Sequence, residues 1–134
     1  MKDLSAFDAA IVDARAFIRD KQRGDWHSVA CVVLTASGQQ YIGMNLASTL
    51  SRASVCAAPV ALGLAIAQDP DDRIVFCAAV NRRGEVIPPC GPCRELMLDY
   101  AGKAQVAVPE GDGYAVVGMA ALMPTPYKPT QRKP

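Results

Sequence analysis

Three cysteines in two distant segments have the residue type and spacing of a metal site. Cys56 lies in segment 54–59 (SVCAAP), and Cys90 and Cys93 lie in segment 88–94 (PPCGPCR). A zinc ion held by three protein ligands keeps a fourth position for water, as catalytic zinc sites do. The pair Cys90 and Cys93 alone would also fit a redox dithiol or half of a structural zinc knuckle. We predict that the three thiols together bind a metal ion.

The three cysteines fall at the predicted starts of two helices, about 56–68 and 90–100. Three thiolates leave a Zn²⁺ site with an excess negative charge, which the positive ends of two helix dipoles would offset. Water on such an ion is acidified enough to act as a nucleophile near neutral pH. Proton transfer to a leaving group still requires a nearby carboxyl group.

The remaining sequence predicts an α/β fold, a three-layer α/β/α sandwich with a mixed five-stranded sheet. Apolar spacing predicts a first helix over 4–20 and a hairpin of strands 29–34 and 39–45 that turns at Ser37-Gly38. Ser54 is the expected N-cap of the second helix and Gly102 the expected C-cap of the third. Further strands are predicted at 73–80 and 104–108, a loop at 81–85 leads to Val86-Ile87, and segment 114–117 is either a strand or the start of a last helix.

Composition places the 134 residues in one domain, residues 1–127, followed by a Pro-rich basic tail at 128–134. The formal net charge is +1 and no basic stretch is dense, so we expect no nucleic-acid partner. The N-terminal segment lacks the apolar core of a signal peptide, and the longest apolar run, 55–67, is too short to span a membrane. Five cysteines suit a reducing cytoplasm better than a disulfide framework.

Five motifs in order resemble the tetrameric cytidine deaminases, and most closely the blasticidin-S deaminase-like branch. Both cysteine segments belong to this set, and the signature of a ligand, one residue, a glutamate and a later Pro-Cys-x-x-Cys is typical of zinc nucleobase deaminases. The other three motifs are His27-Ser28-Val29-Ala30, Gly43-Met44-Asn45 and segment 122–127 (LMPTPY).

The resemblance implies a zinc-dependent hydrolytic deaminase that attacks C4 of a cytosine ring and releases ammonia. It implies that Cys56, Cys90 and Cys93 are the zinc ligands and that the assembly is a homotetramer. It also implies substrate contacts at Asn45, which would bond a ribose-like hydroxyl, and at His27, Ala57 and Tyr127, with Tyr127 reaching in from a neighbouring subunit. The alternatives are an ordinary half-buried histidine at His27 and interface packing at Tyr127.

The largest departure from the family is Ala58, which stands where the family has its proton-shuttling glutamate. A methyl group transfers no proton, and general acid–base catalysis contributes about 10²–10⁴-fold, so we expect the chain to be nearly inactive. Glu95 is not placed to substitute. An engineered change, which we favour, and a natural non-catalytic form both fit this sequence.

Two more departures concern the substrate and the zinc charge. Ala47 stands where cytidine deaminases carry a ribose-binding glutamate, so the ring carries something other than plain ribose, or is a free base or modified nucleoside. Pro59 stands where many relatives have an arginine that neutralises the thiolates; Arg52 or Arg94 would serve instead, or both are ordinary surface arginines.

Three classes of function remain. The leading hypothesis is the deaminase of a cytosine-like nucleoside or related amino-heterocycle, and the alternative is a non-catalytic zinc-containing protein that binds a small molecule in the same pocket. A purely structural zinc or thiol-redox protein is disfavoured, because only His27 is available as a fourth ligand. Cys31 and Cys77 lie in apolar strand runs and are expected in the core.

Overall fold

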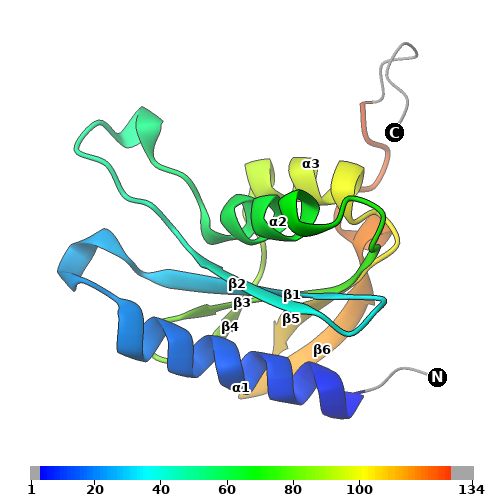
Figure 1. Cartoon of the computed structure of the whole chain (residues 1–134), viewed down its shortest axis with the longest axis horizontal. Helices are drawn as coiled ribbons and strands as arrows, with labels where there is room; N and C mark the ends of the chain where they lie inside the picture. The colour runs from blue at the N-terminus through cyan, green and yellow to red at the C-terminus, as the bar shows by residue number, and fades with distance from the viewer. Residues whose placement is uncertain (1–3, 128–134) are drawn as a thin grey trace.

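A central sheet separates one helix from two others (Figure 1). The computed structural model describes residues 4–127. Helix α1 (Leu4–Lys21) covers one face of the sheet, whereas α2 (Ala57–Gln68) and α3 (Gly91–Tyr100) cover the other. This arrangement confirms the predicted three-layer α/β/α fold.

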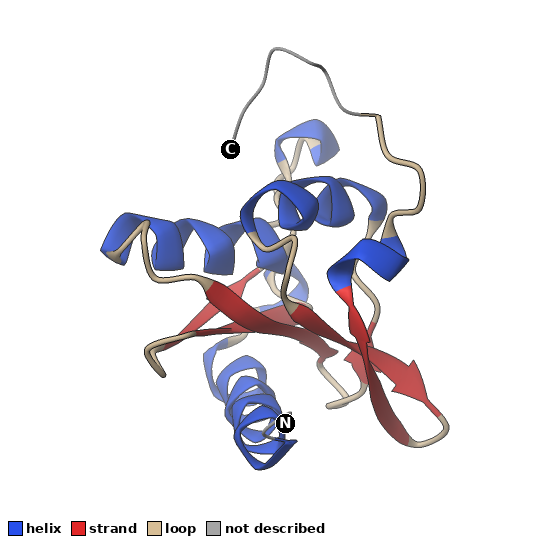
Figure 2. Ribbon diagram, turned by 90° about the vertical axis from the view of Figure 1, so that its right-hand side faces the viewer, coloured by secondary structure: helices blue, strands red, loops and turns tan. Residues whose placement is uncertain are grey.

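The sheet, drawn in red in Figure 2, is mixed, and its main path runs in the order β2-β1-β3-β5-β6. Five strands form this path, as predicted, and the two-residue β4 is a sixth strand that pairs with β3. Because β1 occupies one edge of β3, both β4 and β5 pair along its other edge. The strands are β1 (Val29–Thr35), β2 (Gln40–Met44), β3 (Ile74–Asn81), β4 (Val86–Ile87), β5 (Gln105–Glu110) and β6 (Gly113–Gly118).

Alternation along the strands creates two hydrophobic cores, one on each face of the sheet. On the α1 face, the rings of Phe7 and Phe76 stack with centroids 4.0 Å apart. On the opposite face, Cys31 and Cys77 pack in the same cluster as Met97 of α3. Cys31 and Cys77 are each 2% exposed, which confirms that they belong to the core.

Two predicted helix caps are wrong, because local contacts differ from the simple capping rules. The N-cap of α2 is Cys56, while the Oγ of Ser54 accepts a hydrogen bond from the backbone N–H of Ser48 at 2.9 Å. The C-cap of α3 is Ala101. Gly102 suits its position for a steric reason, since an added Cβ would lie 2.7 Å from the carbonyl oxygen of Leu98.

The last part of the described chain settles the open alternative for segment 114–117. That segment lies within β6, and a short 3₁₀ helix, η3 (Met119–Leu122), follows it.

Pro59 is the third residue of α2, in the first turn as predicted, where its missing N–H leaves no helical bond unmade. The predicted tail at 128–134 lies outside the described residues. None of the helices within residues 4–127 combines the length and apolarity needed to cross a membrane.

The close approach of β2 to α2 yields a stability prediction. A Cβ on Gly43 would lie 2.7 Å from the backbone nitrogen of Ala61 and 2.8 Å from Cγ1 of Val60. Gly43→Ala should therefore push α2 off the sheet and lower the free energy of unfolding by about 1–3 kcal/mol, measured by urea denaturation. The matched variant Gly63→Ala, whose Cβ would meet no atom within 4 Å, should be neutral or stabilising. Equal destabilisation by both substitutions would contradict this account.

Candidate metal centre and pocket

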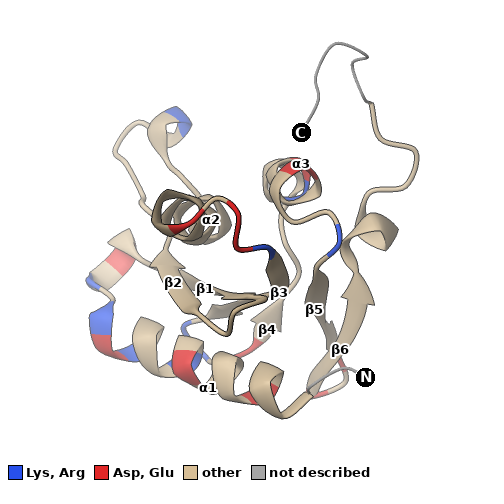
Figure 3. Cartoon of the chain, turned by 45° about the vertical axis from the view of Figure 1, so that its right-hand side comes forward, with Lys and Arg blue, Asp and Glu red and all other residues tan. Residues whose placement is uncertain are grey.

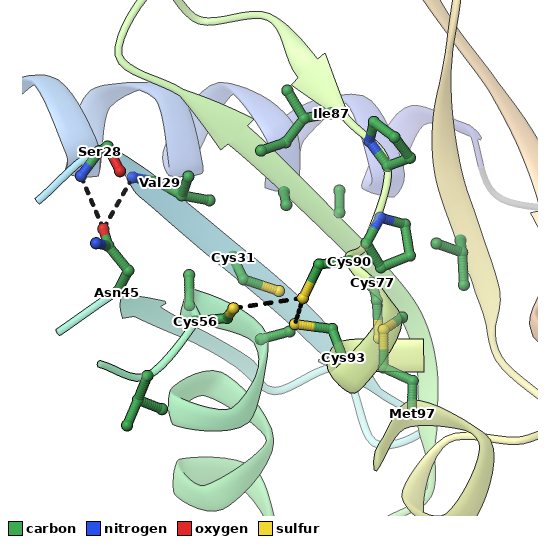
Figure 4. Close-up of a pocket in the computed structure, with 18 of the residues that line it drawn as sticks. Ser28, Val29, Cys31, Asn45, Cys56, Cys77, Ile87, Cys90, Cys93 and Met97 are labelled. Atoms are coloured by element: carbon green, nitrogen blue, oxygen red, sulfur yellow. Dashed lines mark hydrogen bonds between the residues drawn. The ribbon is translucent and has the colours of Figure 1, made fainter. Parts of the chain in front are cut away.

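The three predicted metal ligands lie together at one end of α2 and α3 (Figure 4). The Sγ atoms of Cys56 and Cys90 are 3.4 Å apart, and those of Cys90 and Cys93 are 2.9 Å apart. All three sulfurs lie within 4.8 Å of one another. The structure therefore brings residues 34 positions apart in the sequence into a single cluster.

Backbone geometry explains why the cysteines meet. Cys56 is the N-cap of α2, Cys90 is the N-cap of α3, and Cys93 is the third residue of α3. Just before α2, Leu46 and Val55 form an isolated antiparallel bridge, with reciprocal N–H···O bonds of 2.8 and 2.9 Å, that fixes where the helix begins. Both helix N-termini thus present their positive dipole ends to the sulfurs, which favours the thiolate form that binds metal.

The donor set fits a zinc ion. Zinc–sulfur bonds of about 2.3 Å at tetrahedral angles hold sulfurs about 3.8 Å apart, so the separations of 3.4 and 2.9 Å here would have to widen by less than about 1 Å around an ion. Within residues 4–127, no histidine, further cysteine or carboxylate joins the cluster as a fourth ligand. Cys93 is buried, whereas Cys56 and Cys90 are exposed, so the cluster has an accessible side. Three soft ligands with an accessible side match the zinc cofactor that the sequence predicts, in the type of site that catalytic zinc ions occupy.

The three thiols differ in acidity because they share hydrogen bonds. Burial raises the pKa of the Cys93 thiol, and its hydrogen bonds with Cys90 and Cys56 raise it further. Burial also raises the pKa of Cys56. For Cys90, burial acts in the raising direction but is outweighed by its hydrogen bonds with the Cys93 thiol and the Cys93 backbone, so the pKa of Cys90 falls below the usual value. Cys90 is therefore the first to ionise in the metal-free chain, and a metal must displace protons from the other two.

A pocket of about 390 Å³ opens beside the sulfurs. Its walls come from β1, β3, the loop before α2 and the segment between β4 and α3, and both Ala57 and Ala58 line it. The charged side chains lie elsewhere: Figure 3 shows them along α1, on α3 and in loops, with almost none on the strands. Among the described residues that line the pocket, none is charged and none is aromatic. Its size is that of a small-molecule site.

Asn45 lines the pocket in a fixed orientation. Its Oδ1 accepts hydrogen bonds from the backbone N–H groups of Ser28 at 2.7 Å and Val29 at 3.0 Å (Figure 4). These two donors require the oxygen on that side, so the amide nitrogen is left to donate elsewhere. In the substrate contact predicted for Asn45, its side chain can therefore act only as a hydrogen-bond donor, through the amide nitrogen.

His27 and Tyr127 are not among the residues that line the pocket of the single chain. The Nδ1 of His27 accepts a hydrogen bond from the backbone N–H of Arg23 at 3.0 Å, and Arg82 donates to the backbone oxygen of His27 at 2.7 Å. Tyr127 is 81% exposed at the end of the described chain. Their roles toward a substrate stay predictions.

The structure gives a well-defined place to Ala58, the position where the resemblance implies a glutamate. Ala58 is 6% exposed and faces the pocket from the first turn of α2, two residues after Cys56. Glu95 lies on the exposed side of α3, away from the buried face formed by Cys93 and Met97. Within the described chain, no acidic side chain or histidine lines the pocket in place of Ala58.

Arg94 has a role that the sequence did not reveal. Its Nε donates to the carbonyl oxygen of Pro89 at 2.9 Å, and its Nη1 donates to that of Leu122 at 3.2 Å. The guanidinium thus ties the backbone just before Cys90 to η3. Of the two arginines considered for charge neutralisation, Arg52 lies exposed in the short 3₁₀ helix η2 (Ser51–Ala53). The position of Arg94 directly after the last ligand was the only signal in the sequence.

Known proteins resemble this chain over most of its length. It is 28% identical over 108 residues to blasticidin-S deaminase from Bacillus cereus, covering 75% of this chain and 77% of that protein. The crystal structure of cytidine deaminase from Mycobacterium leprae matches with a TM-score of 0.76 and 24% identity, over 89% of this chain and 98% of that one. The crystal structure of cytidine deaminase from Burkholderia pseudomallei matches with a TM-score of 0.74 and 24% identity, over 95% of this chain and 100% of that one.

No protein-family model matches the chain. The similarities nevertheless confirm the resemblance to cytidine deaminases and blasticidin-S deaminase that the motifs indicated, and they show that the chain has the cytidine deaminase fold.

The contacts of Arg94 predict that it holds the second ligand segment in place. Arg94→Met should weaken zinc retention about tenfold or more, a loss typical of residues that orient metal ligands, measured by competition with a chelator. Arg94→Lys should restore little of the lost zinc retention, because a lysine ammonium cannot bond two separate carbonyl oxygens as the planar guanidinium of arginine does. The exposed Arg52→Met is the control and should retain zinc as the parent does. Unchanged zinc affinity in Arg94→Met would contradict this role.

Proposed function

We propose that this chain is a zinc-dependent hydrolytic deaminase of a cytosine-like nucleoside or a related amino-heterocycle, present in a nearly inactive form. The observation that carries the proposal is the three-cysteine cluster, which has one accessible side and adjoins a pocket of about 390 Å³. Similarity to blasticidin-S deaminase supports the choice of reaction. The fold shared with cytidine deaminases supports the choice of ring.

The reaction replaces an exocyclic amino group with the oxygen of water. One C–O bond forms and one C–N bond breaks; one proton of the water goes to the departing amino nitrogen, which leaves as ammonia, and the other goes to the adjacent ring nitrogen. Zinc, when bound, supplies Lewis-acid activation of a water molecule. The chain holds the ion with Cys56, Cys90 and Cys93, and it offers the amide N–H of Asn45 to an acceptor on the ligand.

Proton transfer is the step for which the chain lacks a group. A carboxyl group at position 58 would face the pocket next to the ligand Cys56, where it could take a proton from water and deliver it to the amino group. The methyl group of Ala58 does neither. The cost of losing such a group is about 10²–10⁴-fold in rate.

The second candidate is a non-catalytic protein that binds the same kind of ligand. The observation in its favour is the same charge-free pocket, in which the described lining offers no general acid or base. Such a protein would keep the zinc centre and the pocket but would not release ammonia under any single substitution at position 58.

We extend the proposal to a cytoplasmic homotetramer that acts on a small molecule, with neither nucleic acid nor membrane as a partner. Several large apolar side chains on the single chain are exposed and suit a subunit interface, including Trp26 (53%), Leu50 (74%) and Tyr127 (81%). All five cysteines are free thiols, in keeping with a reducing compartment.

Restoring a carboxylate at position 58 separates the two candidates. In the zinc-loaded chain, Ala58→Glu should raise ammonia release by about 10²–10⁴-fold on at least one of cytidine, deoxycytidine, cytosine and a blasticidin-type analogue. The control Ala67→Glu adds the same charge to the exposed side of α2 and should leave the rate at the level of the parent.

Zinc content and urea unfolding would show whether Ala58→Glu is folded and loaded. A folded, zinc-loaded variant that binds these compounds without releasing ammonia would overturn the enzyme proposal in favour of the binding protein. A variant that neither binds nor converts any of them would overturn both candidates for cytosine-like ligands.

A further inference from the structure

The peptide group between His27 and Ser28 lies just outside the sheet, because β1 begins at Val29. Both of its hydrogen-bonding atoms contact side chains. The Nε of Arg82 donates to the carbonyl oxygen of His27 at 2.7 Å. The N–H of Ser28 donates to the Oδ1 of Asn45, also at 2.7 Å (Figure 4). One planar peptide group therefore links the guanidinium of Arg82 to the side-chain amide of Asn45.

Arg82 is anchored at the other end of this connection. It comes from the loop that follows β3, the strand in the middle of the sheet. Its Nη2 also donates to the carbonyl oxygen of Gly24, the first residue of the short 3₁₀ helix η1 (Gly24–Trp26). The guanidinium thus bonds two carbonyl oxygens of one turn, which suits the planar fork of an arginine. Its contact with Asp25, at 4.0 Å and exposed to solvent, adds little.

Asn45 lines the pocket, and its Oδ1 accepts from two N–H groups that are held in different ways. Val29 belongs to β1 and pairs with Asn81 of β3, so the sheet fixes its N–H. Ser28 precedes the strand, and its peptide group can rotate about the single bonds on either side. A bond to the carbonyl oxygen of that group fixes the direction of its N–H, because the two point in opposite directions across one plane.

We propose that Arg82 is a positioning residue of the pocket. By holding the carbonyl oxygen of His27, it aims the N–H of Ser28 at Asn45 and so keeps the amide nitrogen of Asn45 in a fixed place for a ligand. The proposal rests on the deaminase function proposed above, in which Asn45 donates to the ligand. Arg82 is not among the described residues that line the pocket, so it acts through this peptide group.

NMR of the ligand-free, zinc-loaded chain tests the positioning directly. The sequence contains two asparagines, Asn45 and Asn81, so isotope-labelled asparagine gives two sets of side-chain amide signals. Arg82→Met should shift or broaden the signals of Asn45, because the N–H of Ser28 is no longer held toward it. The matched control Arg83→Met removes the same charge one residue along, from a side chain that is 83% exposed, and should leave these signals in place. Unchanged Asn45 signals in Arg82→Met, or equal shifts in both variants, would overturn the proposal.

Calorimetry with cytidine on the same zinc-loaded chains tests the consequence for binding. Arg82→Met should weaken binding about three- to tenfold, the size of effect of one hydrogen bond, and Arg83→Met should bind as the parent does. In an Asn45→Ala background, Arg82→Met should change the affinity by no more than about twofold, because the group that it positions is gone. An equal loss with and without Asn45 would overturn the proposal and would indicate a purely structural hold on η1.

Two further measurements keep these results decisive. Urea denaturation checks that each variant is folded, and Arg82→Gln, with a shorter and uncharged side chain, should show the same changes as Arg82→Met. Unfolding of both Arg82 variants would overturn the proposal, because Arg82 would then support the fold as a whole. If the parent chain binds neither cytidine, cytosine nor a blasticidin-type analogue, the proposed function fails, whereas the NMR comparison still decides the role of Arg82.

Discussion

The meeting of two helix N-termini over one part of the sheet is the constraint on which the rest of the structure depends. Cys56 precedes α2 and Cys90 precedes α3, so the sulfurs can meet only if both helices begin at the same place. The Leu46–Val55 bridge fixes the first start, and the clamp of Arg94 on Pro89 fixes the second. The candidate metal ligands therefore lie together because α2 and α3 begin at neighbouring places in the fold.

The same constraint explains why position 58 faces both the cysteine cluster and the pocket. Ala58 occupies the first turn of α2, so whatever stands there faces both the cysteine cluster and the pocket. The methyl group of Ala58 transfers no proton, whereas the metal-ligand candidates are other side chains, Cys56, Cys90 and Cys93. The proposed loss of turnover therefore concerns a different side chain from those of the cysteine cluster.

Sequence reasoning succeeded where local patterns determine structure. Apolar spacing predicted the helices and the hairpin, and the cysteine motifs predicted the cluster at Cys56, Cys90 and Cys93. It failed at Ser54 and Gly102, where nearby backbone groups decided the caps. It could not identify the clamp of Arg94, because Leu122 is 28 residues away and no periodicity joins them. Nor could it show that the pocket lining is uncharged, since those residues come from several separate segments.

The central claim is that three cysteines hold a zinc ion whose fourth position is open. X-ray absorption at the zinc edge of the loaded chain tests it most directly, because it counts the ligand types around the ion. The account predicts three sulfurs at about 2.3 Å and one oxygen or nitrogen at about 2.0 Å. Four sulfurs, with Cys31 or Cys77 joining the site, would contradict it and would indicate a closed structural centre.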